Sequence, residues 1–129
     1  MLKGKLMVAG LVLALSAVVL TACSSSGGST TAASGEITIR ATEFKFEPAS
    51  IKVTAGKPVT LILKNEGKVE HNIALAGVVS GKDVQIDAKA GETARVEFTP
   101  DKTGVHELSC TLPAHKDAGM VIKLDVTAG

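Results

Sequence analysis

The chain has 129 residues, enough for one small domain, and carries 14 basic and 13 acidic side chains for a net charge of +1. It has no Trp or Tyr and only three Phe, so it offers no basic stripe with stacking aromatic side chains for nucleic acid. We therefore expect no nucleic-acid partner. The core should be modest and poor in aromatic residues, so a bound metal could add to its stability.

The first 22 residues have the composition of an export signal. Lys3 and Lys5 precede an apolar run over residues 6–19, which suits the core of a signal peptide and is short for a membrane span. The next four residues, Leu-Thr-Ala-Cys, end at Cys23 and resemble the bacterial lipobox, in which the Cys is lipidated and becomes the new N-terminus. The sequence predicts a lipoprotein signal peptide over residues 1–22 and lipidation of Cys23. The alternatives are an uncleaved anchor helix and an ordinary signal peptide with an incidental Cys.

Residues 24–34 consist only of Ser, Gly, Thr and Ala. This composition cannot bury a core and is typical of a flexible tether, with a reach of about 20 Å and about 40 Å when fully extended. We expect residues 23–35 to be the lipidated Cys and its linker, and residues 36–129 to be the folded domain. The domain would then be exported and anchored by lipid to a bacterial membrane, facing the periplasm or the cell exterior.

The remainder of the chain has the pattern of an all-β protein. Short runs of alternating apolar residues are separated by turn residues such as Gly, Pro and Asn. After Ala41 the phase of the alternation shifts to Phe44 and Phe46, which indicates a bulge or bend near Thr42. The runs lie at residues 37–41, 44–46, 51–53, 59–63, 71–75, 84–88, 94–98, 108–110 and 120–126. They predict an antiparallel Greek-key β-sandwich of seven or eight strands.

Residues 110–120, with the sequence CTLPAHKDAGM, contain three side chains that bind soft metal ions. They supply the thiolate of Cys110, the imidazole of His115 and the thioether of Met120. With a second imidazole, these donors make the ligand set of a mononuclear blue-copper centre. Alternation places Leu108 beside Cys110 on one strand and Met120 beside the apolar face of the next, so a hairpin-like loop would hold all three donors at one end of a sheet. The alternative is a surface loop with a buried Cys and a core Met.

The number of cysteines favours the metal site. The chain has two Cys, and if Cys23 carries lipid, Cys110 has no partner for a disulfide. A lone thiol in an exported domain requires an explanation, because oxidising compartments pair or modify free thiols. Met1 and Met7 would leave with the signal peptide, so Met120 would be the only Met of the mature protein. Zinc is disfavoured, because a zinc site does not use Met, and a dinuclear copper centre would need a second Cys in the loop.

With an upstream His-Asn pair, the loop resembles the cupredoxins, a family that includes plastocyanin, azurin and auracyanin. The resemblance covers residues 36–126, and the four-residue gaps on both sides of His115 are most similar to the auracyanin type. It implies one copper ion that alternates between Cu(I) and Cu(II), with His71 as the fourth ligand beside Cys110, His115 and Met120. It also implies that the side chain of Asn72 ties the His71 segment to Thr111.

Near the loop, His106 is not expected to bind the metal, and Ala114 departs from the family pattern. His106 lies four residues before Cys110, about 13 Å along an extended strand, so we interpret it as a structural residue. Ala114 stands where relatives often carry Gly.

The ligand set predicts an electron-transfer protein and not an enzyme, since no open coordination position for a substrate is implied. We expect a monomer that meets redox proteins transiently, through a small apolar patch of Leu112, Pro113 and Ala114 around the exposed edge of His115. The alternative for this patch is that Leu112 and Pro113 only pack the loop. One alternative is an exported copper carrier or sensor that delivers metal instead of electrons. Another is a metal-free exported sandwich that serves adhesion or assembly.

Overall fold

The computed structural model describes residues 30–31 and 35–129 of the chain. Within these residues the chain is all strand and turn, and they include no helix suited to crossing a membrane. The predicted signal peptide and Cys23 lie outside the described residues.

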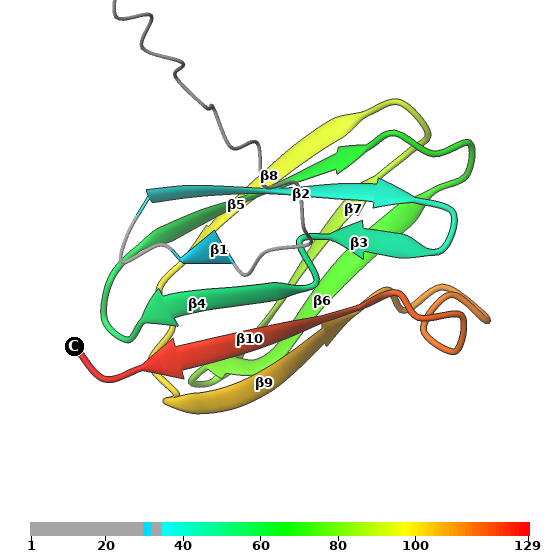
Figure 1. Ribbon diagram of the computed structural model, residues 1–129. Coiled ribbons are helices and arrows are strands. Elements are labelled where there is room, and N and C mark those ends of the chain that lie inside the picture. Colours follow the sequence, from blue (N-terminus) through cyan, green and yellow to red (C-terminus); the bar gives the residue numbers. More distant parts are fainter. Residues whose placement is uncertain (1–29, 32–34) are drawn as a thin grey trace, which may run out of the picture.

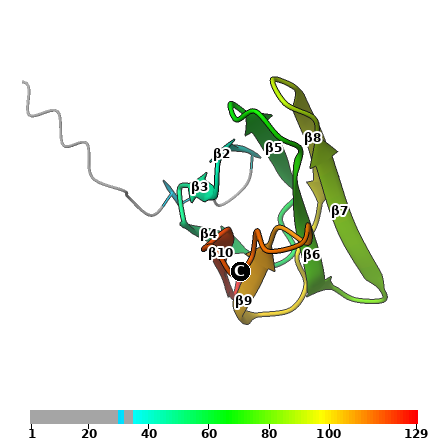
Figure 2. The ribbon, with the colours of Figure 1, turned by 90° about the vertical axis from the view of Figure 1, so that its right-hand side faces the viewer.

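The strands form two sheets that face each other (Figures 1 and 2). The larger sheet has the order β1 (Thr30–Thr31), β4 (Ser50–Thr54), β10 (Val121–Thr127), β9 (Gly104–Ser109), β6 (His71–Val79) and β7 (Lys82–Ala88). The smaller sheet has the order β3 (Lys45–Glu47), β2 (Gly35–Thr42), β5 (Val59–Asn65) and β8 (Thr93–Phe98).

This architecture confirms the predicted all-β sandwich, with two differences in detail. The described residues contain ten strands instead of seven or eight, because the two-residue β1 and the three-residue β3 are counted separately. The sheets are also mixed, since β2 pairs with β5 and β4 pairs with β10 in parallel. Alternation in a sequence shows which face of a strand is buried, but it contains no information about the direction of the neighbouring strand.

The core lies between the sheets and consists of the apolar side chains that alternate along each strand. β2, β4, β5 and β10 each bury every second residue, as the period of two requires. The hairpin after β2 corrects one expectation, because Phe44 and Phe46 do not share a face. Phe46 is buried in the core, whereas Phe44 lies in the turn between β2 and β3 and is 45% exposed. The phase shift therefore marks a tight hairpin turn at residues 43–44.

Besides the turn between β7 and β8, three connections meet at one end of the sandwich, on the right in Figure 1. They are the turn between β2 and β3, the loop between β5 and β6, and the long loop between β9 and β10. Since β5 and β9 end there and β6 and β10 begin there, residues adjacent to these strand ends are brought close together. We call this region the loop end.

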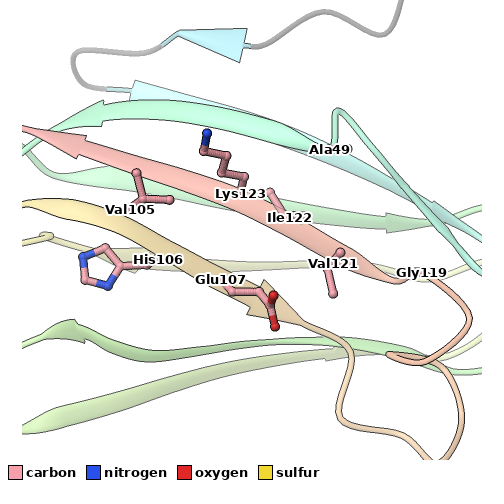
Figure 3. Close-up of a pocket in the computed structure, with 8 residues that line it drawn as sticks. All are labelled: Ala49, Val105, His106, Glu107, Gly119, Val121, Ile122 and Lys123. Atoms are coloured by element: carbon pink, nitrogen blue, oxygen red, sulfur yellow. The ribbon is translucent and has the colours of Figure 1, made fainter.

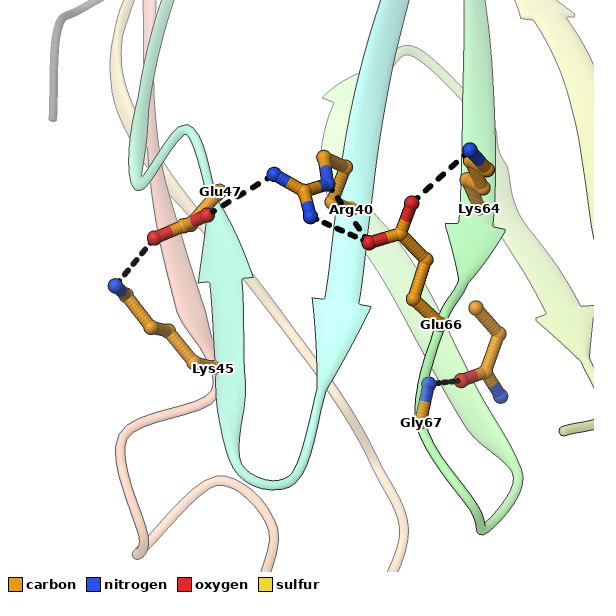
Figure 4. Close-up of polar contacts among 7 residues, drawn as sticks. Arg40, Lys45, Glu47, Lys64, Glu66 and Gly67 are labelled. Carbon is orange, nitrogen blue, oxygen red and sulfur yellow. Dashed lines mark hydrogen bonds and ion pairs between the residues drawn. The ribbon is translucent and has the colours of Figure 1, made fainter. Parts of the chain in front are cut away.

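The outer face of the smaller sheet carries a row of alternating charges, shown in Figure 4. Arg40 on β2 pairs with Glu66 through Nε at 2.9 Å and contacts Glu47 on β3 at 3.7 Å. Glu66 also pairs with Lys64 at 3.0 Å, and Glu47 pairs with Lys45. We call these five side chains the ion-pair row.

Candidate metal centre

The loop end brings together three side chains that bind metals: His71, Cys110 and His115. His71 is the first residue of β6, Cys110 directly follows β9, and His115 lies within the loop from β9 to β10. One nitrogen of each imidazole and the Cys110 sulfur all lie within 4.8 Å of one another. The sulfur is 3.4 Å from Nδ1 of His115, and the two imidazole centres are 5.1 Å apart. These separations suit three ligands of one ion with metal–ligand bonds of about 2 Å.

Strand alternation explains why His71 and Cys110 point inward. His71 shares its face of β6 with Ile73 and Leu75, and all three are fully buried. Cys110 continues the inward face of β9 after Leu108, and both are fully buried as well. His115 is half-buried, because it lies on a loop that covers the end of the core. Two of the donors are therefore fixed by the core, and the third faces the surface.

Met120 closes the neck of the loop through its backbone. Its N–H donates to the carbonyl of His115 at 3.1 Å, and its carbonyl accepts from the N–H of Cys110 at 3.1 Å. Its side chain is fully buried in the core next to β10. Met120 thus holds the backbones of the other two loop residues in place, and its predicted role as axial ligand stays a prediction.

Tight turns stiffen the rest of the loop. The N–H of Ala118 donates to the carbonyl of Ala114 at 3.1 Å, and the N–H of Gly119 donates to that of Lys116 at 2.9 Å. Ala114 has φ of 64°, in the left-handed region, where a side chain with a Cβ costs about 1–2 kcal/mol. Ala114 thus replaces the Gly that is common in cupredoxins at a position where the backbone conformation favours Gly.

Asn72 and Thr111 make the contact that the family resemblance implies. Oδ1 of Asn72 accepts from the N–H of Thr111 at 2.7 Å, and Nδ2 of Asn72 donates to Oγ1 of Thr111 at 2.9 Å. Asn72 is buried, and each partner is adjacent in sequence to a donor of the metal group. The pair therefore joins the start of β6 to the end of β9 directly behind His71 and Cys110.

The imidazole of His71 fits a metal ligand. Among the described residues, neither of its ring nitrogens has a hydrogen-bond partner, although the ring is buried. Buried polar atoms without partners are uncommon in proteins, and a bound metal ion would supply the partner that this ring lacks. Burial lowers the pKa of His71, and the nearby His115 lowers it further. The nearby Glu43 opposes this shift in part, and the net effect favours the neutral ring, which is the form that binds metals.

His106 is not part of this group. It lies in the first half of β9, away from the end that leads to Cys110, and lines an open groove on β9 and β10 (Figure 3). Its Nε2 donates to the carbonyl of Lys102 at 2.8 Å. This hydrogen bond gives the His106 side chain a partner, so its position needs no metal ion to explain it.

The three residues of the predicted docking patch do not all lie on the surface. Pro113 and Ala114 are exposed beside His115, whereas Leu112 is partly buried and packs against the core. The backbone folds into a turn at Leu112, whose carbonyl accepts from the N–H of His115 at 3.2 Å. Leu112 thus contributes more to the packing of the loop than to its surface.

Sequence reasoning missed the turn between β2 and β3 as part of the site. The ring of Phe44 packs edge-on against His115, with 5.2 Å between ring centres and 77° between planes. The neighbouring Glu43 accepts hydrogen bonds from the loop that leads to His71. The phase shift at Phe44 signalled a turn, but alternation alone could not show which end of the sandwich the turn would contact.

Comparisons with known proteins agree with this geometry. The profile of the cupredoxin-like domain family matches residues 12–122 of the chain. The copper-resistant cuproprotein CopI of Rubrivivax gelatinosus is 31% identical in an alignment of 98 positions that covers 64% of this chain and 59% of CopI, so this chain spans less than two thirds of that relative.

Two solved structures are also similar to this chain. Auracyanin A, a "blue" copper protein of Chloroflexus aurantiacus, has a TM-score of 0.59 and 25% identity over 78% of this chain and all of its own. Auracyanin B has a TM-score of 0.62 and 24% identity over 72% of this chain and 88% of its own. Together with the match to the cupredoxin-like family, the His-Cys-His group indicates a single copper site.

Proposed function

Because this chain belongs to the family of cupredoxin-like domains, we propose that it is a mononuclear type 1 copper protein that carries single electrons between redox partners. The observation that supports this most is the buried group of His71, Cys110 and His115, with its donor atoms within 4.8 Å of one another. In this proposal these three side chains form the trigonal ligand set and Met120 is the weak axial ligand.

A bound copper ion would supply a one-electron couple. The two sheets hold His71 and Cys110 in the core, and the backbone hydrogen bonds of Met120 hold His115 in its loop. Such a rigid set changes little when the charge of the site changes, which favours rapid electron transfer. With four protein ligands no position remains for a substrate, so the proposal includes no catalytic reaction.

The test is copper loading of the purified protein followed by redox cycling. One equivalent of Cu(II) should give an intense visible band from charge transfer by the Cys110 thiolate, and the band should disappear and return on reduction and reoxidation. Cys110→Ser should remove the band even where copper still binds. His106→Gln is the matched control and should leave the spectrum nearly unchanged. A copper-loaded protein without colour would contradict the proposal.

A second candidate function is delivery of copper, which the name of CopI as a copper-resistant cuproprotein favours. The same donors could bind Cu(I) and release it to an acceptor. The two functions differ in what leaves the protein on each cycle. Retention of copper through repeated cycles in the presence of a Cu(I) chelator would support electron transfer, whereas loss of copper on each reduction would support delivery.

Redox partners should dock on the exposed surface around His115. Pro113, Ala114 and Phe44 border this histidine, and the charge of Lys116 is paired with Glu107 at 2.8 Å. A small apolar patch with balanced charge suits a transient contact of a monomer that depends little on salt. Pro113→Lys should slow electron transfer to the partner, whereas Val105→Lys, an exposed site on the groove in Figure 3, should not. Equal rates for both variants would place the contact elsewhere.

We also propose that Cys23 anchors the protein to a bacterial membrane, outside the cytoplasm. The support is the lipobox-like sequence before Cys23 and the Ser-Gly-Thr-Ala tether after it. Cys23→Ala should abolish incorporation of labelled lipid and move the protein out of the membrane fraction. Lipid labelling that persists in this variant would contradict the anchor.

A further inference from the structure

The turn between β2 and β3 contacts both the ligand loop and the loop that leads into His71. The carboxylate of Glu43 accepts from the N–H of Lys68 and, at 3.2 Å, from the N–H of Val69. These residues belong to the loop that leads directly into His71. Phe44 packs against His115. One short turn thus contacts the loop before one imidazole and the ring of the other.

Gly67 shows how closely Glu43 approaches His71. A Cβ on Gly67 would lie 2.6 Å from Oε1 of Glu43 and 3.1 Å from Nε2 of His71. The carboxylate and the imidazole therefore both lie against Gly67, and the absence of a side chain there permits the approach. Among the described residues Nε2 of His71 has no hydrogen-bond partner, so the carboxylate of Glu43 acts on this ring through its nearby negative charge and not through a hydrogen bond.

Hydrogen bonding keeps Glu43 ionised. The backbone N–H of Lys68 contributes most to holding the pKa of Glu43 below its usual range. The side chain is exposed on its outer side, so solvent screens part of its charge.

We propose that Glu43 is a positioning residue of the metal centre, which clamps the loop before His71 and lowers the reduction potential through its charge. The proposal rests on the function proposed above. A negative charge beside a ligand stabilises the more positive, oxidised form of the site relative to the reduced form. The clamp adds two hydrogen bonds to a charged acceptor, which are stronger than hydrogen bonds between neutral groups.

The two roles can be separated by two substitutions. Glu43→Gln keeps an oxygen that accepts from Lys68 and Val69 but removes the charge. Glu43→Ala removes both the charge and the acceptor. Glu47→Gln is the matched control, because Glu47 lies on the same hairpin and its carboxylate is paired with Lys45 and Arg40.

The first measurement is a redox titration of the copper-loaded full-length protein. Glu43→Gln should raise the ratio of reduced to oxidised protein at a fixed potential by up to about tenfold, equivalent to about 59 mV for one electron. Glu47→Gln should stay near the wild-type value. A Glu43→Gln protein with the wild-type potential would overturn the electrostatic role.

The second measurement is amide hydrogen exchange at Lys68 and Val69, which needs no copper. Exchange at both amides should accelerate at least tenfold in Glu43→Ala and stay near wild type in Glu43→Gln. Unchanged exchange in Glu43→Ala would overturn the clamp. Failure of the proposed function would look different, because the wild-type protein itself would then lack a coloured one-electron couple while the exchange result would still hold.

Discussion

The loop end and the ion-pair row use polar side chains in opposite ways. In the ion-pair row every charge has a partner of opposite sign, and the side chains of Arg40 and Glu47 are about half exposed. At the loop end His71 is fully buried, and neither of its ring nitrogens has a hydrogen-bond partner. The charges of the row are satisfied by one another, whereas no residue in the part of the chain that the structure describes bonds to the imidazole nitrogens of His71.

Burial explains why this difference matters. An exposed ion pair replaces contacts with water by contacts of similar strength, so it contributes little to stability. A buried imidazole has lost its hydrogen bonds to water and gains a partner only when an ion binds. The free-energy cost of burying it is therefore recovered only through ion binding. The loop end, where burial of the imidazole has a cost in the absence of a metal ion, is therefore the region suited to bind one.

The strongest way to test this contrast is His71→Leu. In protein treated with a chelator, the substitution should raise the free energy of unfolding by about 1 kcal/mol, because it removes an unpartnered buried polar group. It should also abolish stabilisation by copper, which is about 4 kcal/mol at a free copper concentration one thousand times Kd. Urea unfolding with and without copper measures both effects. His106→Leu, which loses the bond to Lys102, should be destabilising instead.

Asn72→Ala tests the polar pair behind the donors. The substitution removes the buried amide of Asn72 and leaves the N–H of Thr111 without its 2.7 Å acceptor, so the free energy of unfolding should fall by about 2 kcal/mol. The control is Gln85→Ala, which removes an exposed amide that donates to Asp87 at 2.8 Å and should change stability far less. Equal effects of the two variants in urea unfolding would remove the distinction between buried and exposed pairs.

Ala114→Gly should stabilise the loop. Gly adopts the left-handed backbone of this position without strain, but it also gains freedom in the unfolded chain, so the expected net gain is about 0.5–1 kcal/mol. Ala118→Gly is the matched control, since Ala118 lies on the same loop outside the left-handed region, and it should be destabilising. Thermal unfolding of both variants gives the comparison, and a loss of stability in Ala114→Gly would argue against the strain.

The smallest effect belongs to the ion-pair row. Hydrogen bonds from Arg40 and then Lys64 lower the pKa of Glu66 from 4.5 to about 2. A carboxyl with a depressed pKa stabilises the folded state fully above pH 4.5, and this contribution is lost as the pH falls towards 2. Glu66→Gln should flatten the decline of stability between these pH values, and high salt should weaken the effect. An identical acid profile for wild type and variant would show that the row contributes nothing.

The sequence predicted the fold class well, because the alternation of apolar residues is a local pattern. Alternation identified the buried faces of β5, β6 and β10, and the spacing of Cys110, His115 and Met120 lies within one loop. What it missed depends on contacts between distant segments. The parallel pairing of β2 with β5, the contact of Phe44 with His115 and the approach of Glu43 to His71 each join residues that no local period connects.

Leu112 illustrates the same limit at the scale of one side chain. Its position in an exposed loop predicted a surface role, yet it packs against the core. The composition of a loop does not show which of its apolar residues faces inward, because irregular backbone has no fixed period.

The burial of Cys110 bears on how the protein survives before it acquires its metal. Its sulfur has no exposed surface, and disulfide exchange requires direct attack by one sulfur on another. As long as the loop remains folded, small oxidised thiols and other copies of the chain cannot reach it, so mixed disulfides and covalent dimers should form only through unfolding. A folded molecule would therefore keep its thiol available for metal loading even under oxidising conditions.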